Sequence, residues 1–136
     1  MPITHAVPVL RVESVERSIA FYGGHLAFCS DPFPEKPPYQ FAILQHGKTE
    51  LMLRRGTPPA RPKPKPYDWD VYLRFEQTDF RVLYTTLNEL GLVTRRLERM
   101  FYGPAEFEIT DPDGYVLCLS QMLEDASDLP SPCPAV

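Results

Sequence analysis

Few side chains in this sequence could carry out nucleophilic or metal-assisted chemistry. The 136 residues include three histidines and three cysteines. His25 and His46 lie in segments typical of the surface, and Cys118 would need a matching histidine to make a metal site. The sequence contains no glycine-rich phosphate loop, nucleophile elbow or cysteine–histidine pair. By itself it therefore identifies no catalytic residue.

Composition limits the classes of partner. The formal net charge of −4 argues against a nucleic-acid surface and mildly favours a cationic ligand. No apolar stretch approaches the length of a membrane span, and the N-terminus lacks the pattern of a secretion signal. Cys29, Cys118 and Cys133 are scattered and odd in number, which favours free thiols in a reducing compartment. We expect a cytoplasmic protein with no nucleic-acid and no membrane partner.

A repeat in the sequence indicates how the chain is organised. Residues 10–13 read LRVE and residues 73–76 read LRFE, and each run leads from a strand-like into a helical pattern. A repeat of this length divides the chain into two similar halves.

The first half is predicted as a βαβββ unit. Ser14 is a good N-cap for a helix over residues 15–22, which Gly23 and Gly24 would end. Strands are expected at residues 5–12, 25–30, 39–45 and 49–54, with a proline-rich loop at 31–38 and a hairpin turn at 46–48.

The second half repeats this order. Thr78 or Asp79 would cap a helix that runs through Leu90 and ends at Gly91. Strands are expected at residues 69–76, 92–97, 105–110 and 115–121, with the DPDG turn at 111–114. The chain would then consist of a first module (1–56), a Pro/Lys/Arg-rich linker (57–67), a second module (68–122) and a flexible acidic tail (123–136).

Three motifs give the chain a family resemblance. They are VLRVESVERSIAFY at residues 9–22, VYLRFE at 71–76, and YGPAEF at 102–107 followed by DPDGY at 111–115. Over residues 5–121 the sequence resembles the vicinal oxygen chelate superfamily of glyoxalase I, bleomycin-resistance proteins, fosfomycin-resistance enzymes and extradiol dioxygenases. The resemblance implies an α+β fold in which two βαβββ repeats form a curled, barrel-like mixed sheet. It also implies a ligand cleft and a homodimer.

The resemblance implies where a catalytic member would hold a divalent metal. Those positions, on the first, fifth and last strands, fall here on Val7, on Tyr72 or Asp70, and on Cys118. Valine has no lone pair to donate to a metal, and we interpret Cys118 as a small buried apolar residue rather than a ligand. We therefore expect no metal and no other cofactor. The alternative is a metal-dependent lyase or dioxygenase with a set rearranged around His5, Glu50, Asp70 or Tyr72.

The expected cleft has an aromatic and aliphatic lining with a few charges, which suits an organic ligand. Strand alternation would direct Val71, Leu73 and Phe75 toward the helices, so that Tyr72 and Arg74 face the cleft. Replacing Tyr72 by alanine should then weaken a ligand at little cost to the fold. The ligand-binding residues predicted in this way are Val7, Arg11, Met52, Arg54, Trp69, Asp70, Tyr72, Arg74, Phe101, Tyr102 and Cys118.

The sequence thus favours a bleomycin-resistance-like protein that binds a small organic molecule without a metal, as in drug or metabolite sequestration. An interaction module whose barrel is too narrow for a ligand is a further alternative. The arginines predicted inside the cleft weigh against that alternative, because a buried unpaired guanidinium is costly.

Overall fold

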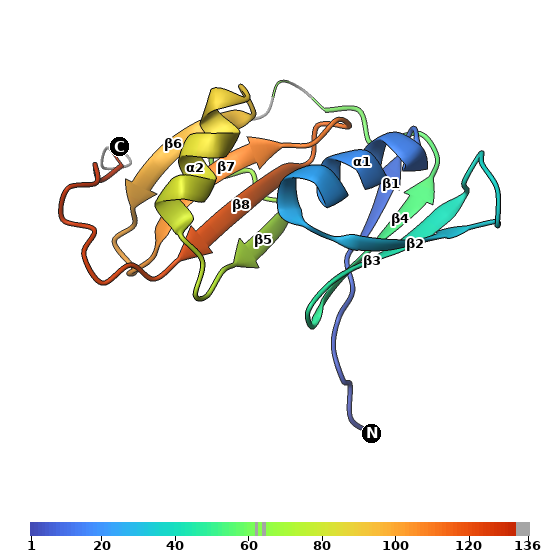
Figure 1. The fold of residues 1–136 in the computed structure, drawn as a ribbon, viewed down its shortest axis with the longest axis horizontal. Coiled ribbons are helices and arrows are strands. Elements are labelled where there is room, and N and C mark those ends of the chain that lie inside the picture. Colours follow the sequence, from blue (N-terminus) through green and yellow to red (C-terminus); the bar gives the residue numbers. More distant parts are fainter. Residues whose placement is uncertain (62, 64, 133–136) are drawn as a thin grey trace. The chain divides into compact units, whose positions relative to one another are not determined.

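The computed structural model of the chain describes residues 1–61, 63 and 65–132. The chain divides into two compact units, Met1–Pro62 and Lys63–Val136. Over the described residues, each unit forms a four-stranded mixed sheet with a helix on one face (Figure 1). The predicted α+β fold of two βαβββ repeats is confirmed. The described strands make two separate sheets rather than one closed barrel.

The first unit has the strand order β1-β4-β3-β2, in which β1 is parallel to β4 and the other neighbours are antiparallel. The Ser14 hydroxyl caps α1 by accepting a hydrogen bond from the Arg17 backbone N–H. The elements are β1 (Val9–Val12), α1 (Val15–Leu26), β2 (Cys29–Phe33), β3 (Phe41–His46) and β4 (Thr49–Arg55).

The prediction that Gly23 and Gly24 end the first helix is wrong. The helix continues through both glycines to Leu26, and Ala27 adopts the left-handed conformation with φ 57°. Leu26 and Phe28 are buried, and the Phe28 N–H donates to the Tyr22 carbonyl. Burial of these two side chains outweighs the weak helix propensity of glycine.

The predicted position of the second strand is also wrong. It was predicted at residues 25–30 with a loop from residue 31, whereas β2 begins at Cys29 and extends through Pro32 to Phe33. Proline lacks a backbone donor, but β2 is an edge strand that pairs only with β3, so no ladder partner is missing on its outer side. Likewise β1 begins at Val9, after Pro8, rather than at residue 5.

The second unit repeats the topology with the order β5-β8-β7-β6. The Asp79 side chain caps α2 by accepting from the Val82 N–H, and Gly91 follows the helix with φ 75°. The rings of Phe80 and Tyr84 on α2 each lie 5.1 Å from the Phe107 ring on β7. The elements are β5 (Val71–Arg74), α2 (Phe80–Glu89), β6 (Val93–Arg99), β7 (Ala105–Thr110) and β8 (Val116–Gln121).

The segment after Met122, expected as a flexible tail, contacts the second unit over its described part. The Arg81 guanidinium pairs with the Asp128 carboxylate at 2.8 Å, and the Arg99 N–H donates to the Pro130 carbonyl at 2.9 Å. Ala126 is buried. Residues 62 and 64 of the predicted linker, and residues 133–136 with Cys133, lie outside the described residues.

Candidate functional site

One face of the second sheet packs on α2, and the other face carries polar side chains. Tyr72 on β5 is paired in register with Cys118 on β8, and Cys118 is paired with Glu108 on β7. These three residues therefore share one face. The neighbouring Phe107 contacts α2 from the opposite face.

Irregular pairing in β6 adds two charged side chains to this polar face. The register shifts between Val93 and Arg95 and again between Arg95 and Glu98. As a result Arg95 lies opposite Glu108, and Glu98 lies opposite Glu106. A bulge re-aims the side chains that follow it, so residues three positions apart can face the same way.

These residues form a buried ionic group, the Arg95 cluster, which consists of Arg95, Glu98, Glu106 and Glu108. Arg95 Nη1 lies 3.0 Å from Glu98 Oε1, and Nη2 lies 3.1 Å from Glu106 Oε1. The Nε atom of Arg95 binds Glu108 Oε2. All four side chains are at most 8% exposed. One guanidinium faces three carboxylates, so the fully ionised cluster carries excess negative charge.

Hydrogen-bond donors around the cluster stabilise this excess charge. The Tyr72 hydroxyl donates to Glu106 Oε2 at 2.7 Å, and the Tyr102 hydroxyl donates to the same oxygen. The Trp69 indole N–H donates to Glu108 Oε2 at 2.9 Å, and the Tyr67 backbone N–H donates to that oxygen at 3.1 Å. The Cys118 thiol lies 3.4 Å from Glu106 Oε1. A buried polar network with its groups paired in this way is rigid.

Burial and the neighbouring carboxylates keep the acidic donors of the cluster protonated. Burial is the largest cause that raises the pKa of Tyr72, Tyr102 and Cys118, and Glu106 adds to the increase in each case. Burial alone would lower the pKa of Arg95, but hydrogen bonds and charge from Glu108 and Glu98 outweigh it and raise that pKa. At neutral pH Cys118 is therefore a thiol, which is a poor nucleophile and a poor metal ligand.

Three aromatic rings lie at the surface above the cluster and form what we call the aromatic face: Tyr67, Trp69 and Tyr102. Their exposed fractions are 44%, 39% and 45%. Each ring belongs to a residue that donates a hydrogen bond to a carboxylate of the Arg95 cluster. The Arg95 guanidinium lies 4.4 Å from the centroid of the Tyr67 ring, within cation–π range. The rings are therefore held in place while part of each remains accessible.

The structure brings together four of the residues predicted to bind ligand: Trp69, Tyr72, Tyr102 and Cys118 contact members of the Arg95 cluster. Arg74 borders them, with its guanidinium 5.7 Å from the Tyr72 ring centroid.

The other predicted residues lie elsewhere. Phe101 is 95% exposed and contacts the Tyr102 ring. The Asp70 carboxylate accepts from the Val116 N–H at 2.8 Å, so it caps the start of β8. Val7, Arg11, Met52 and Arg54 belong to the first unit, where Val7 is half-buried and Arg11 pairs with Arg54 across β1 and β4.

Sequence reasoning missed the Arg95 cluster itself. Glu106 and Glu108 alternate with the apolar Phe107 and Ile109 along β7, and all four are buried. This alternation of glutamates with apolar residues, on a strand that pairs on both sides, could have predicted that one face of the sheet is buried and polar. Arg95 gave no such signal, because it reads as part of a polar strand end until the irregular pairing of β6 is known.

The residues at the family's metal positions do not fit a divalent metal. Val7 offers no donor atom, the Tyr72 hydroxyl donates to Glu106, and the Cys118 thiol is held protonated. Asp70, the alternative to Tyr72 on the fifth strand, accepts a hydrogen bond from the Val116 N–H. Of the alternative set, His5 Nε2 and Glu50 Oε2 lie 3.3 Å apart at the surface of the first unit. Over residues 1–61, 63 and 65–132, no group of three or more His, Cys, Asp or Glu side chains could hold a metal ion.

Known proteins share this architecture. The family model described as Glyoxalase/Bleomycin resistance protein/Dioxygenase superfamily matches residues 3–119. Among solved structures, a virulence protein from Salmonella typhimurium is similar with a TM-score of 0.65 and 24% identity over 90% of this chain and 100% of that one. No curated protein matches the sequence.

Two further solved structures agree in fold. TioX from Micromonospora sp. ML1 has a TM-score of 0.69 at 17% identity, covering 88% of this chain and 99% of that one. Lactoylglutathione lyase from Agrobacterium tumefaciens has a TM-score of 0.65 at 17% identity, covering 89% of this chain and 95% of that one. Identities this low support the fold alone. No helix in the described part of the chain is long and apolar enough to cross a membrane.

Proposed function

Because the chain belongs to the Glyoxalase/Bleomycin resistance protein/Dioxygenase superfamily, we propose that it is a cytoplasmic protein that binds a small organic molecule without a metal ion. The ligand would contact the aromatic face of Tyr67, Trp69 and Tyr102. The observation that carries this proposal is that three half-exposed aromatic residues each donate a hydrogen bond to one buried cluster of carboxylates, with the Tyr67 ring also lying against Arg95.

Anchoring supports binding for an energetic reason. A ring that is already immobilised loses little conformational freedom when a ligand stacks on it, so more of the contact energy appears as affinity. The excess negative charge of the Arg95 cluster below the rings favours a planar ligand with positive charge. Sequestration is favoured over nucleophilic catalysis, because burial raises the pKa of the Cys118 thiol and keeps it protonated.

Trp69 provides a direct test, since it is the only tryptophan of the chain. Its indole N–H resonance should move when naphthylmethylammonium is added, and should move less with the matched anion naphthoate. A Tyr102→Ala variant should weaken binding of the cation, whereas Tyr39→Ala in the first unit should leave it unchanged. Naphthylmethylammonium that stabilises the protein in a thermal-shift assay but leaves the Trp69 resonance in place would contradict this site.

The metal-free part of the proposal has its own test. Protein purified without chelator should contain far less than one equivalent of divalent metal per chain by elemental analysis. Near one equivalent of nickel, zinc, manganese or iron would instead favour the lyase or dioxygenase alternative. The His5–Glu50 pair would then be the first place to look for ligands.

We further propose that the protein works as a homodimer. On the first sheet, Val9 is 57% exposed and Phe33 is 43% exposed, which leaves apolar surface that a second copy could cover. Light scattering at micromolar concentration should give twice the chain mass. A monomer mass at every concentration would contradict this part alone.

A further inference from the structure

The face of the first sheet that points away from α1 carries a row of two arginines and two phenylalanines. On the other face, which α1 covers (Figure 1), Leu10, Leu53 and Ala42 are paired in register and buried. Strand alternation directs the next residue of each strand to the opposite face. The members of this row, which are paired in register across the sheet, are Arg11 on β1, Arg54 on β4, Phe41 on β3 and Phe33 on β2.

The two arginines of the row are direct neighbours, and both are exposed. Adjacent strands lie about 4.8 Å apart, so two guanidinium groups in register can reach one anion. Like charges opposite each other in a sheet are unfavourable, and an anion bound between them would remove that repulsion. Among residues 1–61, 63 and 65–132, no carboxylate forms an ion pair with Arg54.

The Arg11 side chain is held against the backbone of Gly56. A Cβ atom added at Gly56 would lie only 2.9 Å from Cγ and Cδ of Arg11, so the arginine stem packs where glycine leaves room. The Gly56 N–H donates to the Val12 carbonyl at 2.9 Å, which fixes this backbone beside β1. A side chain that is already restricted loses less entropy when it binds a ligand.

An aromatic ring lies beside the two guanidinium groups. Phe41 is paired with Arg54 and is half-buried. The Phe33 ring lies 5.8 Å from the Phe41 ring, centroid to centroid, and supports it from the edge strand. A planar group placed against Phe41 would gain an aromatic contact, while an anionic group on the same molecule reached the arginines.

We infer that this row binds a phosphate monoester of a planar aromatic group. The phosphate contacts Arg11 and Arg54, and the aromatic group contacts Phe41. A phosphate monoester suits the row because it carries nearly two negative charges at neutral pH and three strong acceptor oxygens, which guanidinium groups bind through paired hydrogen bonds. The inference does not rest on the ligand site proposed above, because the aromatic face takes no part in it.

Titration of the full-length, isotope-labelled protein with phenyl phosphate tests the inference by NMR. The Nε–H resonances of Arg11 and Arg54 should shift and saturate, with a Kd of about 1 mM for so small a probe. Inorganic phosphate lacks the ring and should bind at least about threefold more weakly. Phenol lacks the anion and should bind at least about tenfold more weakly. Unmoved arginine resonances, or equal affinity for either analogue, would overturn the inference.

Variants of the row check the two charged contacts. Arg11→Gln and Arg54→Gln should each weaken phenyl phosphate binding by about tenfold or more. Arg55→Gln is the matched control, because Arg55 is exposed on the same strand but is paired with the buried Val12 and so belongs to the other face; its affinity should be unchanged. Unchanged affinity in Arg54→Gln would refute the assignment.

Phe41→Leu checks the ring contact. It should weaken phenyl phosphate by about threefold and leave the affinity for inorganic phosphate unchanged. Equal losses for the two probes would contradict the aromatic contact. Light scattering on Arg54→Gln tests for a different occupant of the row: a change of mass with unchanged phenyl phosphate affinity would place a second copy of the chain there and overturn the inference.

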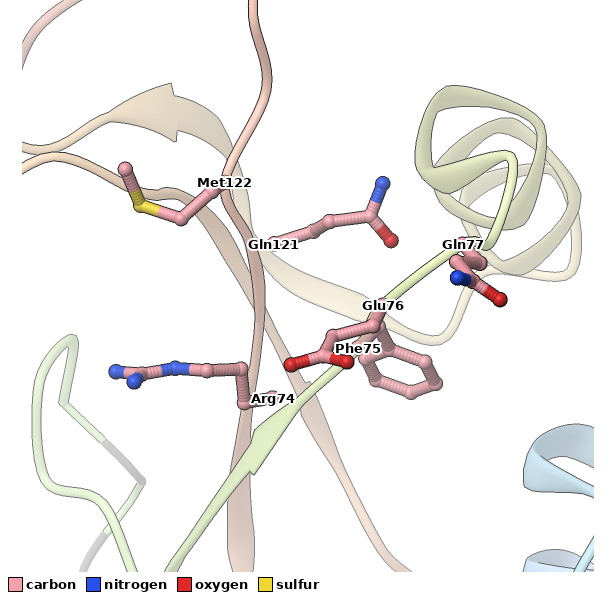
Figure 2. A pocket seen from close by; sticks show the side chains of 6 residues that line it. All are labelled: Arg74, Phe75, Glu76, Gln77, Gln121 and Met122. Atoms are coloured by element: carbon pink, nitrogen blue, oxygen red, sulfur yellow. The ribbon is translucent and has the colours of Figure 1, made fainter.

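A pocket in the second unit supplies a further control, because it also places an exposed arginine beside an aromatic ring. The Arg74 guanidinium lies 5.7 Å from the Tyr72 ring centroid and lines a pocket of about 220 Å³ where β5 and β8 end. Figure 2 shows the lining side chains, which are Arg74, Phe75, Glu76, Gln77, Gln121 and Met122. This pocket offers one guanidinium and a carboxylate where the row offers two guanidinium groups. Phenyl phosphate affinity should be unchanged in Arg74→Gln, and a loss in that variant would place the ligand in the pocket and overturn the inference.

Discussion

Arg95 Nη2 lies 3.1 Å from Glu106 Oε1, and the two side chains are 5% and 0% exposed. This buried pair joins β6 to β7 and is the centre of the network that holds the aromatic rings. Removing one partner of a buried pair is expensive, because the other charge stays buried without compensation. The stability of the second unit and the geometry of the candidate site are therefore linked through the same residues.

Arg95→Met should destabilise the protein by about 3–5 kcal/mol, because three buried carboxylates would lose the guanidinium that pairs with all of them. Urea unfolding measures the change. The matched variant Arg96→Met removes an exposed guanidinium that lies 3.9 Å from Glu98, and should change stability by less than about 0.5 kcal/mol. Similar values for the two variants would show that the Arg95 cluster contributes no special stability.

Stability should fall as pH rises above about 8.5. The folded-state pKa values of Cys118, Tyr72 and Tyr102 lie above their ordinary values, so the unfolded chain loses protons that the folded chain keeps. Fewer bound protons in the unfolded state give a negative slope of unfolding free energy against pH. The decline should start where a free thiol ionises, near pH 8.5, and continue through about pH 10, where free tyrosine ionises. Urea unfolding at a series of pH values measures this decline, and a rise in stability over the range would contradict the raised pKa values. In Cys118→Ala the decline should begin at a higher pH.

Tyr72 should affect both stability and binding. Tyr72→Phe removes a donor to a buried carboxylate, which should cost about 1.5–3 kcal/mol, while the retained ring keeps ligand affinity nearly unchanged. Tyr72→Ala should cost more and should also weaken the ligand, since it removes the ring that lies 5.1 Å from Trp69. Strand alternation alone suggested little cost to the fold, and the hydrogen bond to Glu106 changes that expectation. Equal stability of wild type and Tyr72→Phe would mean that this hydrogen bond contributes nothing.

The described residues after Met122 should contribute to stability. Truncation after Met122 removes the Asp128 partner of Arg81 and the Pro130 carbonyl that accepts from Arg99. We expect Tm to fall by about 2–4 °C, the shift for about 1 kcal/mol in a protein of this size. Truncation after Pro132 is the control that isolates residues 123–132. Identical melting of the two shortened chains would show that these contacts are dispensable.

Ala27→Gly should stabilise the first unit. Ala27 has φ 57° at the end of α1, a conformation that costs a residue with a Cβ about 1–2 kcal/mol. Glycine avoids this cost but loses more backbone entropy on folding, so the net gain should be about 0.5–1 kcal/mol. Ala20→Gly, at an exposed position inside α1, should destabilise by a similar amount. Opposite signs for the two substitutions, measured by thermal unfolding, would verify the helix end.

The sequence by itself determined the order of the elements, the repeat and the family. These follow from local patterns: Ser14 and Asp79 cap the two helices as predicted, and the predicted strand at residues 105–110 matches β7. Caps, turns and alternation act over a few residues, so they are readable without knowledge of the fold. The same local rules failed at Gly23 and Gly24, where burial of Leu26 and Phe28 decided the helix length.

Only the tertiary structure decided which side chains meet at the candidate site. The two register shifts in β6 break strand alternation and turn Arg95 and Glu98 toward Glu106 and Glu108. The hydrogen bond from Trp69 to Glu108 joins residues far apart in sequence. Register and bulges result from packing summed over whole strands, and no short stretch of sequence encodes them. The repeat therefore predicted the two sheets, while the buried charge that positions the aromatic face emerged from how the strands of one sheet pair.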